Sequence, residues 1–131
     1  MLNPIIYILI NGSLKMSPGK AAAQAVHAFA SLENDYTIKE FSRNIQRTVI
    51  VLEVDNQQQI DNLSKYLTAC SIPCSSYIDE GVNEVSPYSV TAMAVGPIYS
   101  DELDKRQLFS TFPLFPKRKL EKKQSFFKKH L

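Results

Sequence analysis

Hydrophobic residues along this chain form short continuous runs, separated by stretches in which they recur at helical spacing. The continuous runs at 5–10, 48–54, 74–78 and 90–95 predict four strands, and the first two are expected to be buried on both faces. Between the first two runs, the pattern predicts a helix that Ser17 caps and that extends to about Leu32. Strands that alternate with helices indicate a three-layer α/β domain.

The rest of the pattern completes this arrangement. Asp55 is expected to cap a second long helix, whose apolar positions 60, 63, 67 and 70 follow the helical period before Pro73. Short helices are expected at 101–108 and within the ambiguous stretch 35–45, and a rim segment at 112–115. The fourth strand is expected to close at Gly96-Pro97. Only a turn-rich loop joins the last two strands, so part of the sheet should be antiparallel.

Three polar side chains share one face of the first predicted helix. Lys20, Gln24 and His27 stand at i, i+4 and i+7, among neighbours that are nearly all small or apolar. A helix this apolar is expected to be largely buried, so its polar stripe must be paired or must open into a cleft. Lys20 lies in the first turn, where an anion is favoured, and its expected partner is a ligand phosphate or Asp79 after the third strand.

Each candidate residue also has a purely structural interpretation. Lys20 could face solvent at a frayed helix end, and His27 could be a hydrogen-bonded core residue. Thr91 in the fourth strand could supply a hydroxyl group, or could reflect strand propensity alone. Asn83 could be a turn residue, and the rings of Tyr77 and Tyr88 could stack on a base or simply pack.

Composition and charge narrow the class of protein. The length of 131 residues suits one domain, and no apolar run approaches the roughly 20 residues of a membrane span. The first strand lacks the flanks of a signal peptide, so we expect a cytoplasmic protein without membrane contact. Cys70 and Cys74 have no metal-site or redox spacing and are expected to be buried thiols.

Basic residues concentrate at the C-terminal end. Residues 117–131 have a charge balance of +6 within a total of +2, which leaves −4 for residues 1–116. We therefore expect an α/β domain at 1–116 and a basic tail at 117–131. Such a tail suits a polyanion such as RNA, or is a solvated segment that aids solubility.

Together these segments resemble the archaeal and eukaryotic-type peptidyl-tRNA hydrolase family, the second of two unrelated hydrolase families. The resemblance rests on Leu14-Lys15-Met16 followed by Gly19-Lys20, Ala22-Ala23-Gln24 and His27-Ala28, and continues at 47–52, Ile72-Pro73, Asp79-Glu80-Gly81 and 91–97. It implies an α/β/α sandwich with a mixed four-stranded sheet, often as a homodimer. It also implies hydrolysis, without metal or cofactor, of the ester that joins a peptide to tRNA.

The resemblance places site residues at Lys20, Gln24, His27, Asp79 and Thr91. We expect Lys20 and Asp79 to position water as a coupled pair, Gln24 or Thr91 to hold the ester or water, and His27 to organise the network. Substrate contacts are expected from residues near this cleft and from the beginning of the basic tail, namely Lys15, Gly81, Asn83, Lys117 and Arg118.

Some positions depart from the family's pattern. Asn11 and Ser13 stand where a basic and an acidic residue are usual, Glu80 adds a carboxylate, and Asn83 replaces a threonine. The lost positive charge and the added negative charge make the cleft less attractive to a tRNA backbone. Two alternatives to a peptidyl-tRNA hydrolase follow: a noncatalytic relative that binds RNA or a protein, and a hydrolase of another acyl or aminoacyl ester.

Overall fold

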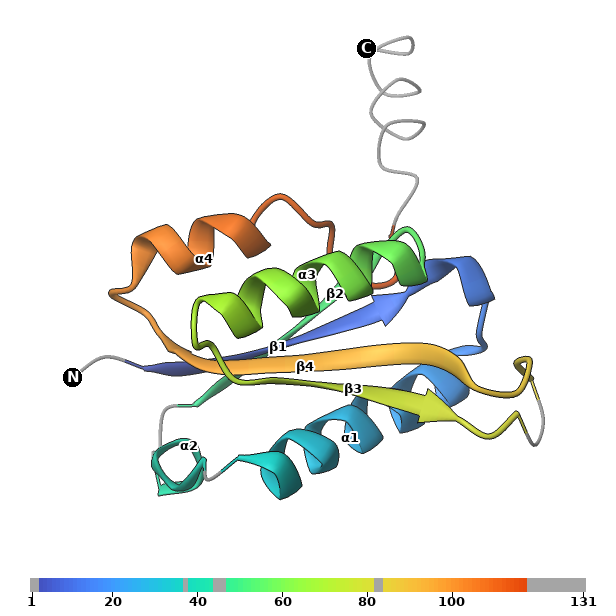
Figure 1. Ribbon diagram of the computed structural model, residues 1–131, viewed down its shortest axis with the longest axis horizontal. Helices are drawn as coiled ribbons and strands as arrows, with labels where there is room; N and C mark the ends of the chain where they lie inside the picture. The colour runs from blue at the N-terminus through green and yellow to red at the C-terminus, as the bar shows by residue number, and fades with distance from the viewer. Residues whose placement is uncertain (1–2, 37, 44–46, 82–83, 118–131) are drawn as a thin grey trace, which may run out of the picture.

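A mixed four-stranded sheet forms the centre of the molecule (Figure 1). The computed structural model describes residues 3–36, 38–43, 47–81 and 84–117. The strands are β1 (Pro4–Asn11), β2 (Thr48–Val54), β3 (Cys74–Asp79) and β4 (Ser89–Tyr99), in the order β2-β1-β4-β3. β2 is parallel to β1, whereas β4 runs antiparallel to both β1 and β3. The mixed sheet and all four predicted strands are confirmed.

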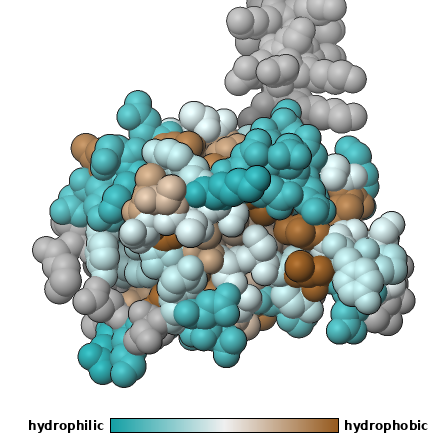
Figure 2. Space-filling view, viewed as in Figure 1, coloured by the Kyte–Doolittle hydropathy of each residue, from teal (hydrophilic) through white to brown (hydrophobic). Residues whose placement is uncertain are grey.

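Helices cover both faces of this sheet. α1 (Pro18–Asp35) and α2 (Lys39–Arg43) lie on one side, and α3 (Gln57–Ala69) and α4 (Leu103–Phe109) lie on the other (Figure 1). A short 3-10 turn, η1 (Gly12–Leu14), joins β1 to α1. In the same orientation, hydrophilic residues predominate over the layer of α3 and α4, and hydrophobic residues show between the layers (Figure 2). The predicted three-layer α/β/α sandwich is therefore confirmed.

β1 is buried along its whole length because both of its faces are covered. Ile6, Ile8 and Ile10 pack into the core on the α1 side, and the alternate residues, such as Tyr7 and Leu9, pack into the core on the α3 side. A continuous apolar run is what such a central strand requires, since every residue meets a hydrophobic layer.

β2 was expected to be buried on both faces, and this is wrong for its first half. It is an edge strand, and the Val49 side chain is 52% exposed. The segment 113–115 covers the free edge only near the carboxyl end: the Glu53 N–H donates to the Pro113 carbonyl at 2.9 Å, and the Phe115 N–H donates to the Val51 carbonyl at 3.0 Å. Position in the sheet, and not the apolar sequence, decides how deeply β2 is buried.

The caps and exposed faces of the helices correct three further predictions. Asn56, and not Asp55, caps α3, because its side chain accepts from the Gln59 N–H at 3.0 Å. Cys70 follows the last turn of α3 and is exposed, while Cys74 is buried as expected. α1 was expected to be largely buried, but it buries only one stripe (Ala21, Gln24, Ala28 and Leu32). Alanine favours the helix wherever it lies, so an alanine-rich helix does not have to be buried.

β4 does not end at Gly96-Pro97 but continues to Tyr99. The register between β4 and β1 shifts between Ile5 and Tyr7, opposite this point, and pairing then resumes. Gly96 has a φ of 123°, and an added Cβ would lie 2.7 Å from the Ile5 carbonyl oxygen. The glycine therefore marks an irregularity inside the strand, a common use of glycine in sheets. Among the described residues, no helix is both long and apolar enough to cross a bilayer.

Candidate active site

The beginning of α1 forms one wall of the candidate site. The Ser17 side chain accepts a hydrogen bond from the Lys20 N–H at 3.2 Å, and Pro18 occupies the first helical position. This confirms the predicted cap, which satisfies a backbone donor that has no partner within the helix. The cap fixes Lys20 in the first turn, just after the carboxyl end of β1.

Lys20 forms an ion pair with Asp79, the last residue of β3. The Lys20 Nζ lies 2.9 Å from Asp79 Oδ2, and the two side chains are only 12% and 9% exposed. The beginning of α1 and the end of β3, which were predicted to face each other, are therefore in contact. A ligand phosphate and Asp79 were the two partners expected for Lys20, and the structure shows the pair with Asp79. The ammonium group, together with the Gly81 N–H that donates to Asp79 Oδ1 at 2.6 Å, holds the pKa of Asp79 below its ordinary value.

Gln24 and Thr91 extend this ion pair into the core. The Thr91 hydroxyl donates to Gln24 Oε1 at 2.5 Å, and both side chains are almost completely buried. This bond leaves the amide nitrogen of Gln24 as its only free donor, and Gln24 makes a small contribution to the lowered pKa of Asp79. One hydrogen bond joins Thr91 to Gln24, and one ion pair joins Lys20 to Asp79. We call these four residues the Lys20–Asp79 network.

His27 lies on the same helical stripe, but the structure places it against an aromatic ring. Its imidazole stacks on the Tyr77 ring, with centroids 4.6 Å apart and an angle of 9° between the planes. His27 is exposed, so it is not the core histidine of the structural interpretation. Tyr77 packs as part of the hydrophobic core, whereas Tyr88 is 78% exposed.

Glu84 is part of the site, although no pattern in the sequence selected it. Its carboxylate accepts from the Ser17 N–H at 3.0 Å and from the Ser17 hydroxyl at 2.7 Å. These two hydrogen bonds, with a smaller contribution from the Lys20 charge, lower the pKa of Glu84. A carboxylate at the beginning of a helix also meets the positive end of the helix dipole. Acidic residues that follow a turn-rich loop are common, so no sequence signal separates Glu84 from its neighbours.

Asn11 and Ser13 have structural roles at the end of β1. Asn11 is buried, and its side-chain amide donates to the Val90 carbonyl at 2.9 Å. Its Oδ1 accepts from the Ser13 N–H at 3.1 Å and from the Ser13 hydroxyl at 2.6 Å. This position therefore fastens β1 to β4 and starts the turn η1, and it does so without a charge.

The structure describes three of the expected substrate-binding residues. Lys15 is exposed and has a left-handed backbone with a φ of 52°. Gly81 has a φ of 78°, and an added Cβ would lie 2.5 Å from the Pro87 nitrogen, so only glycine fits there. The Lys117 N–H donates to Glu53 Oε1 at 2.9 Å. Asn83 and Arg118 lie outside the described residues.

The amino-acid sequence also matches known proteins. A family model described as "Peptidyl-tRNA hydrolase PTH2" matches residues 5–114. The chain belongs to the peptidyl-tRNA hydrolase PTH2 family. The matched residues include the whole Lys20–Asp79 network, and they end before the basic tail.

Archaeal proteins named peptidyl-tRNA hydrolase are similar to this PTH2-family chain. One from Methanococcus vannielii is 30% identical over 105 residues, which are 75% of this chain and 89% of that protein. One from Methanopyrus kandleri is 30% identical over 103 residues, with 75% and 88% covered. One from Pyrobaculum aerophilum is 33% identical over 105 residues, with 75% and 88% covered.

The chemistry available to the site comes from side chains of opposite charge in a mostly buried position. An ammonium group there can stabilise negative charge that develops on a carbonyl oxygen, and an ionised carboxylate can orient water. Within the described ranges, no three His, Cys, Asp or Glu residues are grouped closely enough to bind a metal ion.

Proposed function

We propose that this chain hydrolyses the ester bond between a peptide and tRNA, with the Lys20–Asp79 network as its active site. The proposal is supported by family membership and by one observation in particular. The Lys20 ammonium and the Asp79 carboxylate are paired at 2.9 Å in a mostly buried position at the beginning of a helix. An ester carbonyl that enters this cleft meets a fixed positive charge beside a group that can orient water.

In the proposed reaction, the oxygen of a water molecule attacks the acyl carbon of the ester. Negative charge develops on the former carbonyl oxygen, and the Lys20 ammonium stabilises it. The bond from the acyl carbon to the ribose oxygen then breaks. Of the two protons of the attacking water, one goes to the ribose oxygen and the other to solvent, and the peptide leaves as a carboxylate. The lowered pKa of Asp79 keeps its carboxylate ionised at neutral pH, which suits the orientation of Lys20 and water better than strong proton abstraction.

Gln24 and Thr91 have positioning roles in this scheme. The Thr91 hydroxyl fixes the orientation of the Gln24 amide, and Gln24 contributes to the lowered pKa of Asp79. We assign His27 to the outer part of the cleft, where its stack with Tyr77 forms a flat surface along α1. Lys15, Gly81 and Asn83 near the cleft, and Lys117 and Arg118 in the tail, are proposed to bind the substrate.

The direct test is release of the acyl group from an N-blocked aminoacyl-tRNA. We expect Lys20→Met to lower kcat/KM by about 10²-fold or more, since the loss of one group that stabilises the oxyanion costs about that much. Lys65→Met, at an exposed position on α3, is the matched control and should leave kcat/KM unchanged. If the unchanged chain leaves the ester intact over a range of salt and pH, the hydrolase proposal fails.

The acyl group in this assay also identifies the substrate class. A peptidyl-tRNA hydrolase should act on tRNA that carries an N-blocked amino acid and should spare tRNA with a free amino acid. Equal cleavage of both would instead identify a hydrolase of a broader group of acyl esters.

The tRNA partner should be held partly by the basic tail. We expect the logarithm of the tRNA-binding constant to fall linearly with the logarithm of the salt concentration. Exchange of Lys117 and Arg118 for glutamine should make this slope shallower by up to about 0.9 for each phosphate contact that is lost. An unchanged slope would remove these two residues from the tRNA-binding surface.

Two further properties belong to the proposal. We propose that the chain acts in the cytoplasm, where peptidyl-tRNA is formed during translation, and that it forms a homodimer. Light scattering at increasing protein concentration measures the mass in solution. A mass that stays at 14.8 kDa would exclude the dimer without affecting the hydrolase proposal.

A further inference from the structure

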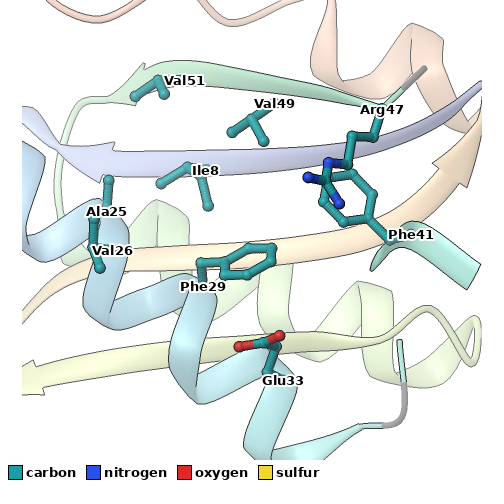
Figure 3. Close-up of a pocket in the computed structure, with 9 residues that line it drawn as sticks. All are labelled: Ile8, Ala25, Val26, Phe29, Glu33, Phe41, Arg47, Val49 and Val51. Atoms are coloured by element: carbon teal, nitrogen blue, oxygen red, sulfur yellow. The ribbon is translucent and has the colours of Figure 1, made fainter. Parts of the chain in front are cut away.

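An apolar groove runs along the side of α1 that is turned away from the Lys20–Asp79 network. It consists of two adjoining cavities of about 470 Å³ and 450 Å³, and both are lined by Ala25 and Val51. Figure 3 shows the larger cavity: Val49 and Val51 project from β2 on one side, and Val26 and Phe29 project from α1 on the other. We call this feature the α1 groove.

The α1 groove is open because of the position of β2 in the sheet. β2 is an edge strand, and α1 packs mainly over β4 and β3, so the face of β2 on this side stays partly uncovered. Val26 is 68% exposed and Val49 is 52% exposed. Contiguous exposed apolar residues of this kind mark a surface that another segment or molecule covers.

The last described residues of the chain lie at one end of this groove. Phe115 and Pro116 line the smaller cavity, and the Phe115 N–H is bonded to the Val51 carbonyl at 3.0 Å. The next residue, Lys117, is held by the hydrogen bond from its N–H to Glu53 Oε1 at 2.9 Å. Residues 118–131 therefore begin at the mouth of the groove, and this covalent connection gives them a high effective concentration there.

We propose that residues 118–131 bind in the α1 groove of their own chain. Leu120, Phe127 and Leu131 stand at i, i+7 and i+11, a spacing that places three apolar side chains on one side of a helix. As a helix, the stripe from Leu120 to Leu131 is about 17 Å long at 1.5 Å per residue, and the part of α1 that lines the two cavities, from Pro18 to Glu33, is about 22 Å long at the same rise. The apolar stripe therefore fits within the length of the groove.

Charge supports the same arrangement. Residues 118–131 contain six basic side chains and one acidic side chain, whereas residues 1–116 have a net charge of −4. Glu33 lines the cavity that does not include Pro116, together with Arg47, so this end of the groove has one carboxylate for the last lysines of the segment and no net charge of its own. With the apolar stripe in the groove, most of the basic side chains point to solvent along α1. The domain thus gains a positive surface that its own residues do not provide.

This inference does not depend on the hydrolase proposal, and its test does not measure activity. Hydrogen–deuterium exchange of the full chain, read by mass spectrometry on fragments from 118–131, should be at least about tenfold slower than for an unprotected peptide. Phe127→Asp should restore rapid exchange, because it places a charge in the apolar stripe.

A matched pair of variants tests the groove itself. Val49 and Ile78 are aliphatic, β-branched and 52% and 54% exposed, and they lie on opposite edge strands of the sheet. Val49→Asp should speed the exchange of residues 118–131 by about tenfold, whereas Ile78→Asp should not change it. A thermal midpoint for each variant confirms that the fold is intact.

Three results would overturn the proposal. In the first, residues 118–131 exchange at the unprotected rate in the unchanged chain. In the second, Val49→Asp and Ile78→Asp have the same effect on that exchange. In the third, protection increases with protein concentration together with a doubled mass in solution, which would identify a second copy of the chain as the occupant.

Discussion

Exchange of Thr91 for valine removes one hydroxyl group from the Lys20–Asp79 network and leaves the side-chain volume almost unchanged. Thr91 is 0% exposed, and its acceptor Gln24 is 2% exposed. In the variant, Gln24 Oε1 is buried and loses the Thr91 donor, which costs about 1–3 kcal/mol of folding free energy. Burial of a methyl group in place of the hydroxyl returns about 0.8 kcal/mol. We therefore expect a net loss of about 0.2–2.2 kcal/mol.

The same change should lower activity through the position of Gln24. Without the Thr91 hydroxyl, the Gln24 amide loses the hydrogen bond that fixes its orientation, and the small lowering effect of Gln24 on the pKa of Asp79 weakens. We expect kcat for an N-blocked aminoacyl-tRNA to fall about tenfold, and the acidic limb of the pH profile to move to higher pH.

Urea denaturation and the hydrolysis assay separate the two effects. Thr91→Val combined with Gln24→Leu leaves neither polar group in the core, so much of the lost stability should return while activity stays low. Thr48→Val, at an exposed position on β2, is the matched control and should change stability by less than about 0.5 kcal/mol. A Thr91→Val chain with unchanged stability and an unchanged pH profile would refute the reasoning.

Three more predictions concern charges and caps. Asp79→Asn should lower kcat/KM by about 10²-fold. It should also remove stability that the unchanged chain has at neutral pH and loses as the pH falls from the ordinary aspartate range to the lowered pKa of Asp79; urea titrations at acidic and neutral pH measure this difference. Glu84→Gln should weaken the beginning of α1 at pH 7, and this effect should be smaller in 1 M salt and at pH 3. Faster hydrogen–deuterium exchange of the backbone amides in the first turn of α1 would measure the weakening. Asn56→Ala should cost about 1 kcal/mol of unfolding free energy and Asp55→Ala less, and the reverse order would contradict the assigned cap of α3.

The layers of the fold were predictable because short segments of the sequence have the composition of the strands and helices that they form. The run at 5–10 has the composition of a strand that is covered on both faces, and β1 lies between β2 and β4. Ser17 and Pro18 have the chemistry of a helix start, and α1 begins where they predict. In both places, local preference and tertiary environment agree.

Other features depend on neighbours that the local sequence does not reveal. The run at 48–54 is as apolar as a central strand, but β2 receives a partner on its second edge only near residues 113–115. The choice between Asp55 and Asn56 as cap depends on one residue of backbone register, since both side chains can accept the hydrogen bond. Cys70 follows the apolar spacing of α3, yet the helix ends at Ala69 and the thiol points away from the core.

The candidate site was predictable in part for the same physical reason. Lys20 and Gln24 stand out because they are polar on a small-residue helix, and Asp79 ends a strand whose carboxyl end lies at that helix start. Glu84 and the buried role of Asn11 have no such signal, because their partners lie 67 and 79 positions away in the chain. Only the packed sheet brings these groups together.

The ion pair between Lys20 and Asp79 joins residues that are 59 positions apart. Lys20 and Gln24 belong to α1, and Asp79 ends the edge strand β3. Thr91 belongs to β4, which pairs with β3, and its hydroxyl bonds to Gln24. No fragment of the chain that lacks one of these elements can assemble the cleft. In a refolding experiment, the return of hydrolysis would therefore report when α1, β3 and β4 have packed together, independently of the docking of β2 at the other edge of the sheet.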